Sequence, residues 1–244
     1  MTLEICIDSI EAAIAAQAGG ADRLELCGNL LEGGTTPTKS MVELCRQYSE
    51  LPIMMMVRPR GGDFLYSDYE FELMQKDIQL AKEMGVKGVV LGLLLEDGNI
   101  DVYRTRQLVE LARPLEVTFH RAFDRVRNPY LALRELINLK VDRILTSGLK
   151  PTVPEGISLI KELVQQAGDE LIIMPGSGVN ETNVADIIAQ TGAREVHSSA
   201  KHQISSQMLY ANPDVYMGAE GVDEYQRNTV SEARVRAMRE AMPW

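Results

Sequence analysis

The amino-acid sequence predicts an α/β fold, a single (β/α)8 TIM barrel in which eight parallel strands form one domain over residues 1–244. Three observations predict it. Eight short apolar runs of strand length recur along the chain, and helical patterns lie between them. The length of 244 residues is close to that of a typical barrel. No GxGxxG motif follows the first run, which argues against an open doubly wound sheet.

The predicted strands are the apolar runs themselves. Gly-Ala or Gly-Val precedes several of them, as expected where a helix ends at glycine and a strand follows. The eight strands are expected at residues 3–8, 23–28, 52–59, 88–95, 115–122, 143–148, 171–178 and 195–200.

Helix start signals lie between these strands. They combine a capping residue with proline at the first helical position, or with glutamate three residues later. Residues 201–228, between the eighth strand and the last helix, are expected to be a long irregular loop, a kind of segment that is usually functional or mobile. The start signals are Thr36 with Pro37, Ser67 with Glu70, Asn128 with Pro129, and Thr229 with Glu232.

Composition and charge argue against several classes of partner. The formal net charge is −10 with no block of lysine and arginine, so no nucleic-acid partner is expected. No apolar run approaches the roughly 20 residues of a membrane span, and the N-terminus lacks signal-peptide features. Three cysteines without a CxxC pair indicate reduced thiols. We therefore expect a cytoplasmic protein with no membrane partner.

The alternation of side chains along the strands predicts an unusually polar barrel interior. One parity of each strand faces the lumen, and the apolar parity packs against the helices. Buried glutamates require partners, and Arg23, Arg58 and Arg143 are the expected ones. The inward residues are predicted to be Glu4, Cys6, Asp8, Arg23, Glu25, Cys27, Glu116, Thr118, His120, Glu195, His197 and Ser199.

The loops after strands seven and eight predict an anion-binding site. Many barrels bind phosphate there through backbone N–H groups, and glycine lets the backbone approach the anion closely. The alternative is a tight turn with no ligand. Arg58 and Arg60 could add charge-assisted hydrogen bonds. The predicted anion-binding residues are Arg60, Gly176, Ser177, Gly178, Ser198 and Ser199.

A soft-metal site is the second candidate. Cys6 and Cys27 are predicted on adjacent strands and both face inward, with Met54 and Met56 on the next strand. Thiolate and thioether ligands favour Cu(I). The alternative is that both cysteines pack as small hydrophobic residues, which are among the most buried types.

Several longer motifs resemble the CutC family of copper homeostasis proteins. They are "RPRGGDFLYSD" (58–68), "VTFHRAFD" (117–124), "ILTSG" (144–148) and "VHSSA" (196–200), with "LEIC" and "LELC" near the start. The resemblance spans the chain. It implies a cytoplasmic barrel that forms homo-oligomers, a role in copper homeostasis, and Cu(I) bound through Cys6 and Cys27, with no other cofactor. Cys6 is followed by "IDS", where some relatives have a second cysteine.

Two functions therefore remain open. One is a copper-binding protein of the CutC family. The other is an enzyme that acts by general acid/base chemistry on a small anionic metabolite, a class that includes phosphorylated ones. In that hypothesis His120 is the acid/base and Glu116 or Asp124 orients its imidazole, with Arg58 and His197 as further catalytic candidates.

Overall fold

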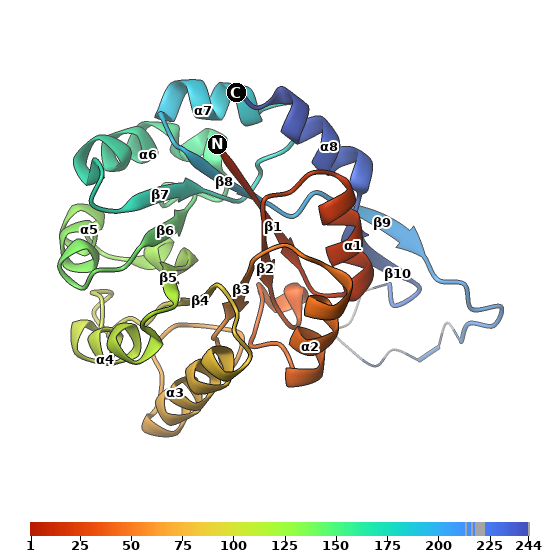
Figure 1. Cartoon of the computed structure of the whole chain (residues 1–244), viewed down its shortest axis with the longest axis horizontal. Coiled ribbons are helices and arrows are strands. Elements are labelled where there is room, and N and C mark those ends of the chain that lie inside the picture. The colour runs from red at the N-terminus through yellow and green to blue at the C-terminus, as the bar shows by residue number, and fades with distance from the viewer. Residues whose placement is uncertain (213, 216, 218–222, 244) are drawn as a thin grey trace.

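The computed structural model describes residues 1–212, 214, 215, 217 and 223–243, and it is a (β/α)8 barrel. Eight parallel strands form one sheet in the order β7-β6-β5-β4-β3-β2-β1-β8, ringed by helices (Figure 1). A bridge between Gly176 and His197 joins β7 to β8 and closes the ring. The strands are β1 (Thr2–Ile7), β2 (Arg23–Leu26), β3 (Ile53–Met56), β4 (Gly88–Leu91), β5 (Glu116–Phe119), β6 (Arg143–Thr146), β7 (Ile172–Pro175) and β8 (Glu195–Ser198).

The helices cover the outside of the barrel. Ser67 and Glu70 form a capping box, and Asn128 caps a helix that begins with Pro129, as predicted. Two predicted starts were wrong, because Thr38 and Ser231, not Thr36 and Thr229, accept the capping N–H bonds. The helices are α1 (Ile10–Ala18), α2 (Lys39–Tyr48), α3 (Asp68–Glu83), α4 (Val102–Ala112), α5 (Pro129–Asn138), α6 (Val153–Ala167), α7 (Val184–Thr191), α8 (Glu232–Ala241), and the short 3-10 helices η1 (Leu30–Glu32) and η2 (Arg121–Arg125).

The main hydrophobic core lies between the sheet and the helices. Leu3, Ile5 and Ile7 of β1 are fully buried there, and Leu24 and Leu26 repeat the pattern on β2. These residues are the apolar parity of each strand, so the opposite parity is left to fill the lumen. No helix among the described residues is both long and apolar enough to cross a membrane.

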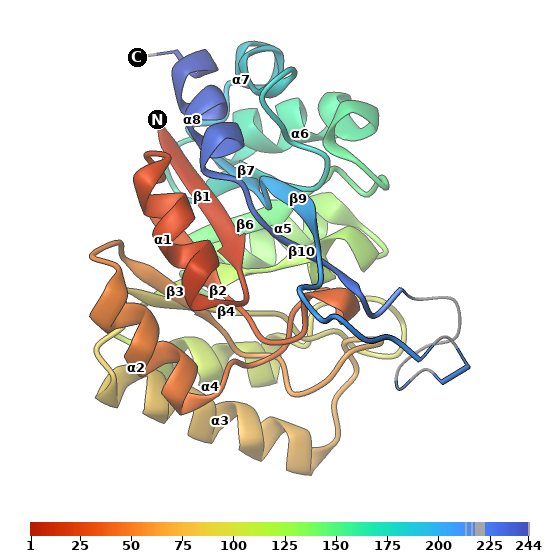
Figure 2. The ribbon, with the colours of Figure 1, turned by 90° about the vertical axis from the view of Figure 1, so that its right-hand side faces the viewer.

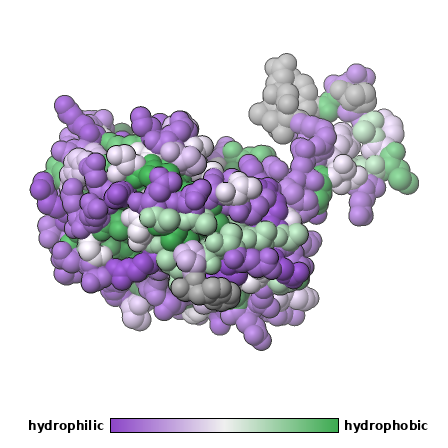
Figure 3. Space-filling model, turned by 90° about the horizontal axis from the view of Figure 1, so that it is seen from above, coloured by the Kyte–Doolittle hydropathy of each residue, from purple (hydrophilic) through white to green (hydrophobic). Residues whose placement is uncertain are grey.

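The predicted irregular loop at 201–228 contains regular structure that the sequence did not predict. Strands β9 (Lys201–Ser205) and β10 (Gln226–Val230) pair antiparallel and project from the barrel (Figures 1 and 2). The segment beyond β9 stands away from the main body (Figures 1 and 3). Within it, Met208, Leu209 and Tyr210 are largely exposed. Positions 213, 216 and 218–222 of the predicted loop lie outside the described residues.

Candidate functional site

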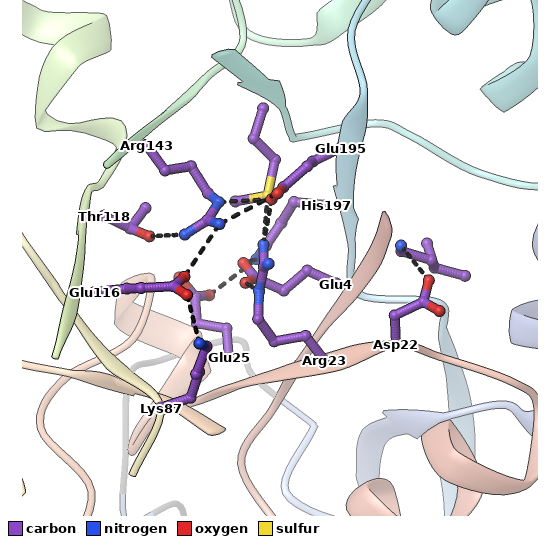
Figure 4. Close-up of polar contacts among 12 residues, drawn as sticks. Glu4, Asp22, Arg23, Glu25, Lys87, Glu116, Thr118, Arg143, Glu195 and His197 are labelled. Carbon is purple, nitrogen blue, oxygen red and sulfur yellow. Dashed lines mark hydrogen bonds and ion pairs between the residues drawn. The ribbon is translucent and has the colours of Figure 1, made fainter. Parts of the chain in front are cut away.

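An ion-pair network fills the lower part of the lumen, at the N-terminal ends of the strands. Glu195 accepts from Arg23 Nη2 at 2.5 Å and from Arg143 Nε at 2.6 Å. Arg23 Nε also binds Glu4 Oε2 at 2.5 Å, since these residues face each other in register on β1 and β2 (Figure 4). Arg143 contacts Glu116 at 3.3 Å. The predicted partners Arg23 and Arg143 are therefore correct for this layer.

A cavity of about 680 Å³ opens at the N-terminal ends of the strands. Its lining includes Arg23, Arg143, Glu116 and Glu195, and Lys87 reaches Glu116 from the rim at 2.7 Å. Catalytic residues of TIM barrels lie at the opposite, C-terminal face, so this cavity is not where barrel enzymes perform their chemistry.

Two cysteines meet at the upper, C-terminal end of the lumen. Cys6 Sγ and Cys27 Sγ are 3.9 Å apart, and both are free thiols that are 8% and 1% exposed. Cys6 lies opposite Glu25 in register, which places Cys27, two residues beyond Glu25, on the same inward face. We call Cys6 and Cys27 the thiol pair. They pack in a cluster with Met54, Met56 and Val90.

A second donor set adjoins the thiol pair, and we call Glu4, Glu25 and His197 the carboxylate–histidine triad. His197 Nε2 is 2.9 Å from Glu25 Oε2 and 4.0 Å from Glu4 Oε1. His197 lies beside Glu4 because β8 pairs with β1 in register at these positions. The Glu25 Oε2 atom also accepts from the Cys27 thiol at 3.8 Å, so Glu25 belongs to both donor sets.

The environment keeps both thiols protonated. The hydrogen bond with Cys27 and burial raise the pKa of Cys6 well above its ordinary value. The hydrogen bond with Cys6 lowers the pKa of Cys27, but burial and the Glu25 carboxylate outweigh it and raise that pKa to about 11. Burial opposes charge on His197, yet the Glu25 carboxylate raises the pKa of its imidazole well above the ordinary value. Neither cysteine is therefore a ready nucleophile, because the thiolate is the reactive form.

The segment that links β2 to α2 covers the thiol pair. It folds back on itself through a bridge between Gly28 and Thr35 and carries η1. Gly34 has φ +90°, and a Cβ there would lie 3.0 Å from Cys27 Sγ, so the backbone passes directly over the thiol. Only glycine combines this conformation with such a close approach. We call residues 28–35 the lid.

Arg58 holds this lid instead of pairing with a glutamate. Its Nη1 donates to the carbonyls of Glu32 at 2.8 Å and Gly34 at 2.7 Å, and its Nη2 donates to Gly62 at 3.1 Å. The prediction that Arg58 neutralises a buried glutamate was therefore wrong. The residue lies just after β3 at the upper end of the barrel, where the nearest acceptors are loop carbonyls and not the carboxylates of the lower layer.

His120 lies just after β5, as "VTFHRAFD" predicted, and it is buried at 4% exposure. Its Nδ1 accepts from the Ala122 N–H at 3.1 Å, and its ring lies 5.0 Å from that of Phe64. Burial, helped by the Arg58 guanidinium, lowers the pKa of His120 to about 4. At neutral pH the imidazole is uncharged.

The residues expected to orient His120 lie elsewhere, so this part of the catalytic hypothesis was wrong. Glu116 is at the opposite end of β5, where it pairs with Lys87 and Arg143. The Asp124 carboxylate accepts from Thr146 Oγ1, from the N–H groups of Ser147 and Leu149, and from Arg121 Nε. These bonds fix η2 to the loop after β6.

The hydroxyls expected at the anion site have protein partners. Ser177 Oγ donates to the Pro151 carbonyl at 2.9 Å, and Ser198 Oγ donates to the Val179 carbonyl at 2.7 Å. All three nitrogens of Arg60 donate within its own loop and to Glu70, so Arg60 does not reach the loops after β7 and β8. Gly176, Gly178 and Ser199 do follow the strands as expected. The Gly176 N–H donates to the Thr146 carbonyl at 3.0 Å. An anion site at the backbone N–H groups of Gly178 and Ser199 remains a prediction.

Glu25 is the member of the site whose role the sequence analysis missed. The alternation of β2 did place Glu25 inward, but Glu25 was expected to form a buried ion pair with an arginine and was not included in either candidate site. Its spacing of two residues from Cys27 was the available signal, because that spacing puts both side chains on one face of a strand.

Several known proteins are similar to this chain. The CutC family model matches residues 1–202. A CutC protein of Chromobacterium violaceum is 50% identical over 240 residues, covering 98% of this chain and 97% of that protein. The human copper homeostasis protein cutC homolog is 46% identical over 97% of this chain and 87% of its own length. A crystal structure of CutC from Streptococcus agalactiae has 32% identity and a TM-score of 0.78, covering 82% of this chain and 98% of that one.

Proposed function

Because this chain belongs to the CutC family, we propose that it serves copper homeostasis by binding Cu(I) at the thiol pair inside its barrel. The observation that carries the proposal is the separation of 3.9 Å between Cys6 Sγ and Cys27 Sγ. Two sulfurs that each contact one ion at about 2.3 Å lie at most about 4.6 Å apart, so both can hold the same ion.

The donor chemistry around the thiol pair suits a soft ion. Thiolate and thioether sulfur select Cu(I), and Met54 and Met56 pack against the two cysteines. Both thiols must lose their protons when the ion binds, and these protons pass to solvent. Burial of the pair beneath the lid also limits contact between a bound Cu(I) ion and dissolved oxidants.

The enzyme hypothesis has less support from the geometry. His120 and His197 do reach the upper lumen, but His120 has neither of the carboxylates that would orient it. Arg58 and Arg60 donate to loop carbonyls and to nearby carboxylates, so they do not converge on a common anion position. Copper binding requires only the thiol pair, which is already assembled.

The test is an anaerobic titration with Cu(I) against a competing chelator. Wild type should bind one ion tightly, and the double variant Cys6→Ser/Cys27→Ser should lose competition with the chelator. Cys45→Ser is the matched control, because Cys45 is also a buried free thiol but lies on α2, away from the pair. Equal Cu(I) affinity in wild type and the double variant would refute the proposal.

Two further parts of the proposal concern location and assembly. Free thiols 3.9 Å apart are suited to a reducing compartment, and the proposed location is the cytoplasm. The exposed Met208, Leu209 and Tyr210 beyond β9 support the proposed homo-oligomer, since burying them against a second copy would remove apolar surface from water. Sedimentation velocity with all three residues changed to serine tests this: a monomer is expected, and an unchanged assembly would exclude this surface.

A further inference from the structure

The carboxylate–histidine triad offers a different set of ligand atoms from the thiol pair. One ligand atom each of Glu4, Glu25 and His197 lies within 4.8 Å of the other two inside the barrel, where the three side chains point toward one another (Figure 4). From this geometry we propose that Glu4, Glu25 and His197 form a second metal site, specific for a divalent transition ion such as Zn²⁺, Mn²⁺ or Fe²⁺.

Unpartnered buried oxygens point to a ligand at this position. Glu4 and Glu25 are 0% and 2% exposed, and the Oε1 atom of each is buried without a hydrogen-bond partner. A buried carboxylate normally has its oxygens satisfied, because leaving a polar atom unpaired is costly. Glu4 Oε1 is also the atom 4.0 Å from His197 Nε2, so it faces into the triad.

The distances fit a single ion. Two ligand atoms that each lie about 2.2 Å from an ion are at most about 4.4 Å apart. The separations of 2.9 Å and 4.0 Å from His197 Nε2 to the two carboxylates fall within that limit, and the two carboxylate oxygens, no more than 4.8 Å apart, need to approach by at most a few tenths of an ångström. When the ion binds, His197 Nε2 exchanges its proton for a metal bond, and the proton leaves to solvent.

The donor types decide the class of ion. Two carboxylates and one imidazole do not favour the soft ion Cu(I), whereas the sulfur atoms of the thiol pair do. An imidazole ligand argues against Ca²⁺ and Mg²⁺, which take oxygen ligands. Zn²⁺, Mn²⁺ and Fe²⁺ accept both donor types. Glu25 borders both positions, because its Oε2 is 3.8 Å from Cys27 Sγ and 2.9 Å from His197 Nε2.

The cavity at the N-terminal end of the barrel lies nearest the triad at Arg23. Arg23 lines the 680 Å³ cavity there and also binds Glu4 directly. Asp22, Glu116 and Glu195 contribute carboxylates to the lining of the same cavity. None of the triad residues lines this cavity, so an ion that enters from it must pass the Arg23 and Glu195 side chains that fill the lower lumen.

The experiment uses the full chain carrying Cys6→Ser/Cys27→Ser, so that the thiol pair cannot account for binding. Zn²⁺ and the spectroscopic probe Co²⁺ are titrated separately. One equivalent of each should bind, and the Co²⁺ form should lack a thiolate charge-transfer band. Adding Glu4→Gln or His197→Asn should weaken Zn²⁺ binding by at least about 100-fold, since even residues that only support a ligand contribute 10–100-fold.

Glu195→Gln is the matched control. It also removes a buried carboxylate from Arg23, but it lies outside the triad, so Zn²⁺ affinity should stay within a few-fold of the parent. If the triad variants do not fold, anomalous diffraction from Zn²⁺-soaked crystals of the double-serine protein locates the ion directly. Absence of Zn²⁺ and Co²⁺ binding, or an ion bound elsewhere, would overturn the site. Neither result bears on Cu(I) binding to the wild-type thiols, so the two proposals fail independently.

Discussion

Replacing His120 by asparagine should make the stability of the protein less sensitive to acid. The imidazole is buried, and burial together with Arg58 lowers its pKa to about 4. Its Nδ1 accepts the Ala122 N–H at the start of η2. Asparagine also caps helices through a side-chain oxygen, so His120→Asn keeps an acceptor at this position but cannot titrate.

The magnitude follows from the difference between the folded and unfolded pKa values. Well above pH 6.5 His120 is neutral in both states and contributes nothing to pH dependence. As the pH falls from 6.5 to 4, the unfolded state takes up a proton that the folded state does not, so stability is lost. A depression from 6.5 to about 4 corresponds to about 3 kcal/mol by pH 4.

Urea denaturation of both proteins at pH values from 7.5 to 4 measures this effect. Any loss of packing in His120→Asn is the same at every pH, so only the change in the difference between the two proteins matters. The free energy of unfolding of wild type should fall by about 3 kcal/mol more than that of the variant. An NMR titration of the His120 ring should have its midpoint near 4. Parallel urea profiles, or a midpoint above 6, would refute the argument.

Two further predictions concern the lid and the Asp124 carboxylate, which joins η2 to the loop after β6. Gly34→Ala should destabilise by about 2–3 kcal/mol and weaken Cu(I) binding, because its Cβ would press on Cys27. The control Gly192→Ala, at φ +74° and ψ 13° with the nearest atom 3.8 Å from the added Cβ, should cost about 1 kcal/mol and leave Cu(I) affinity unchanged. Asp124→Asn should cost about 2–3 kcal/mol in urea denaturation without changing Cu(I) affinity, whereas Asp63→Asn on an exposed carboxylate should stay within about 1 kcal/mol. An equal loss in the free energy of unfolding for the two glycine variants, or for the two aspartate variants, would contradict the reasoning.

The sequence was sufficient for the barrel and for the lumen, because both follow from periodicity. Alternation along β1 and β2 is a local property, so it placed Glu4, Cys6, Glu25 and Cys27 inward without any knowledge of their neighbours. Adjacent parallel strands then bring inward residues of similar height together. This is why the thiol pair could be predicted from two short motifs.

Contacts made by loops could not be predicted in the same way. Arg58 binds carbonyls of residues 24 and 26 positions earlier, and no side-chain pattern marks a carbonyl as an acceptor. Asp124 was likewise expected to orient His120, but η2 turns its carboxylate toward the loop after β6. The β9–β10 hairpin lacks an apolar alternation since most of its residues are exposed.

The closure of the barrel has a consequence for its local opening. Among the described residues, β7 and β8 are joined by one bridge, between Gly176 and His197, whereas the other neighbouring strands share continuous ladders. This boundary between β7 and β8, which we call the seam, is where the barrel should open most readily. Amide hydrogen exchange of the strands should be fastest there. His197 sits on the seam and faces Glu4 and Glu25 on β1 and β2. An ion held by these three side chains would tie β8 to β1 and β2 but not to β7, so it should slow exchange in β8 and leave exchange on the β7 side of the seam unchanged.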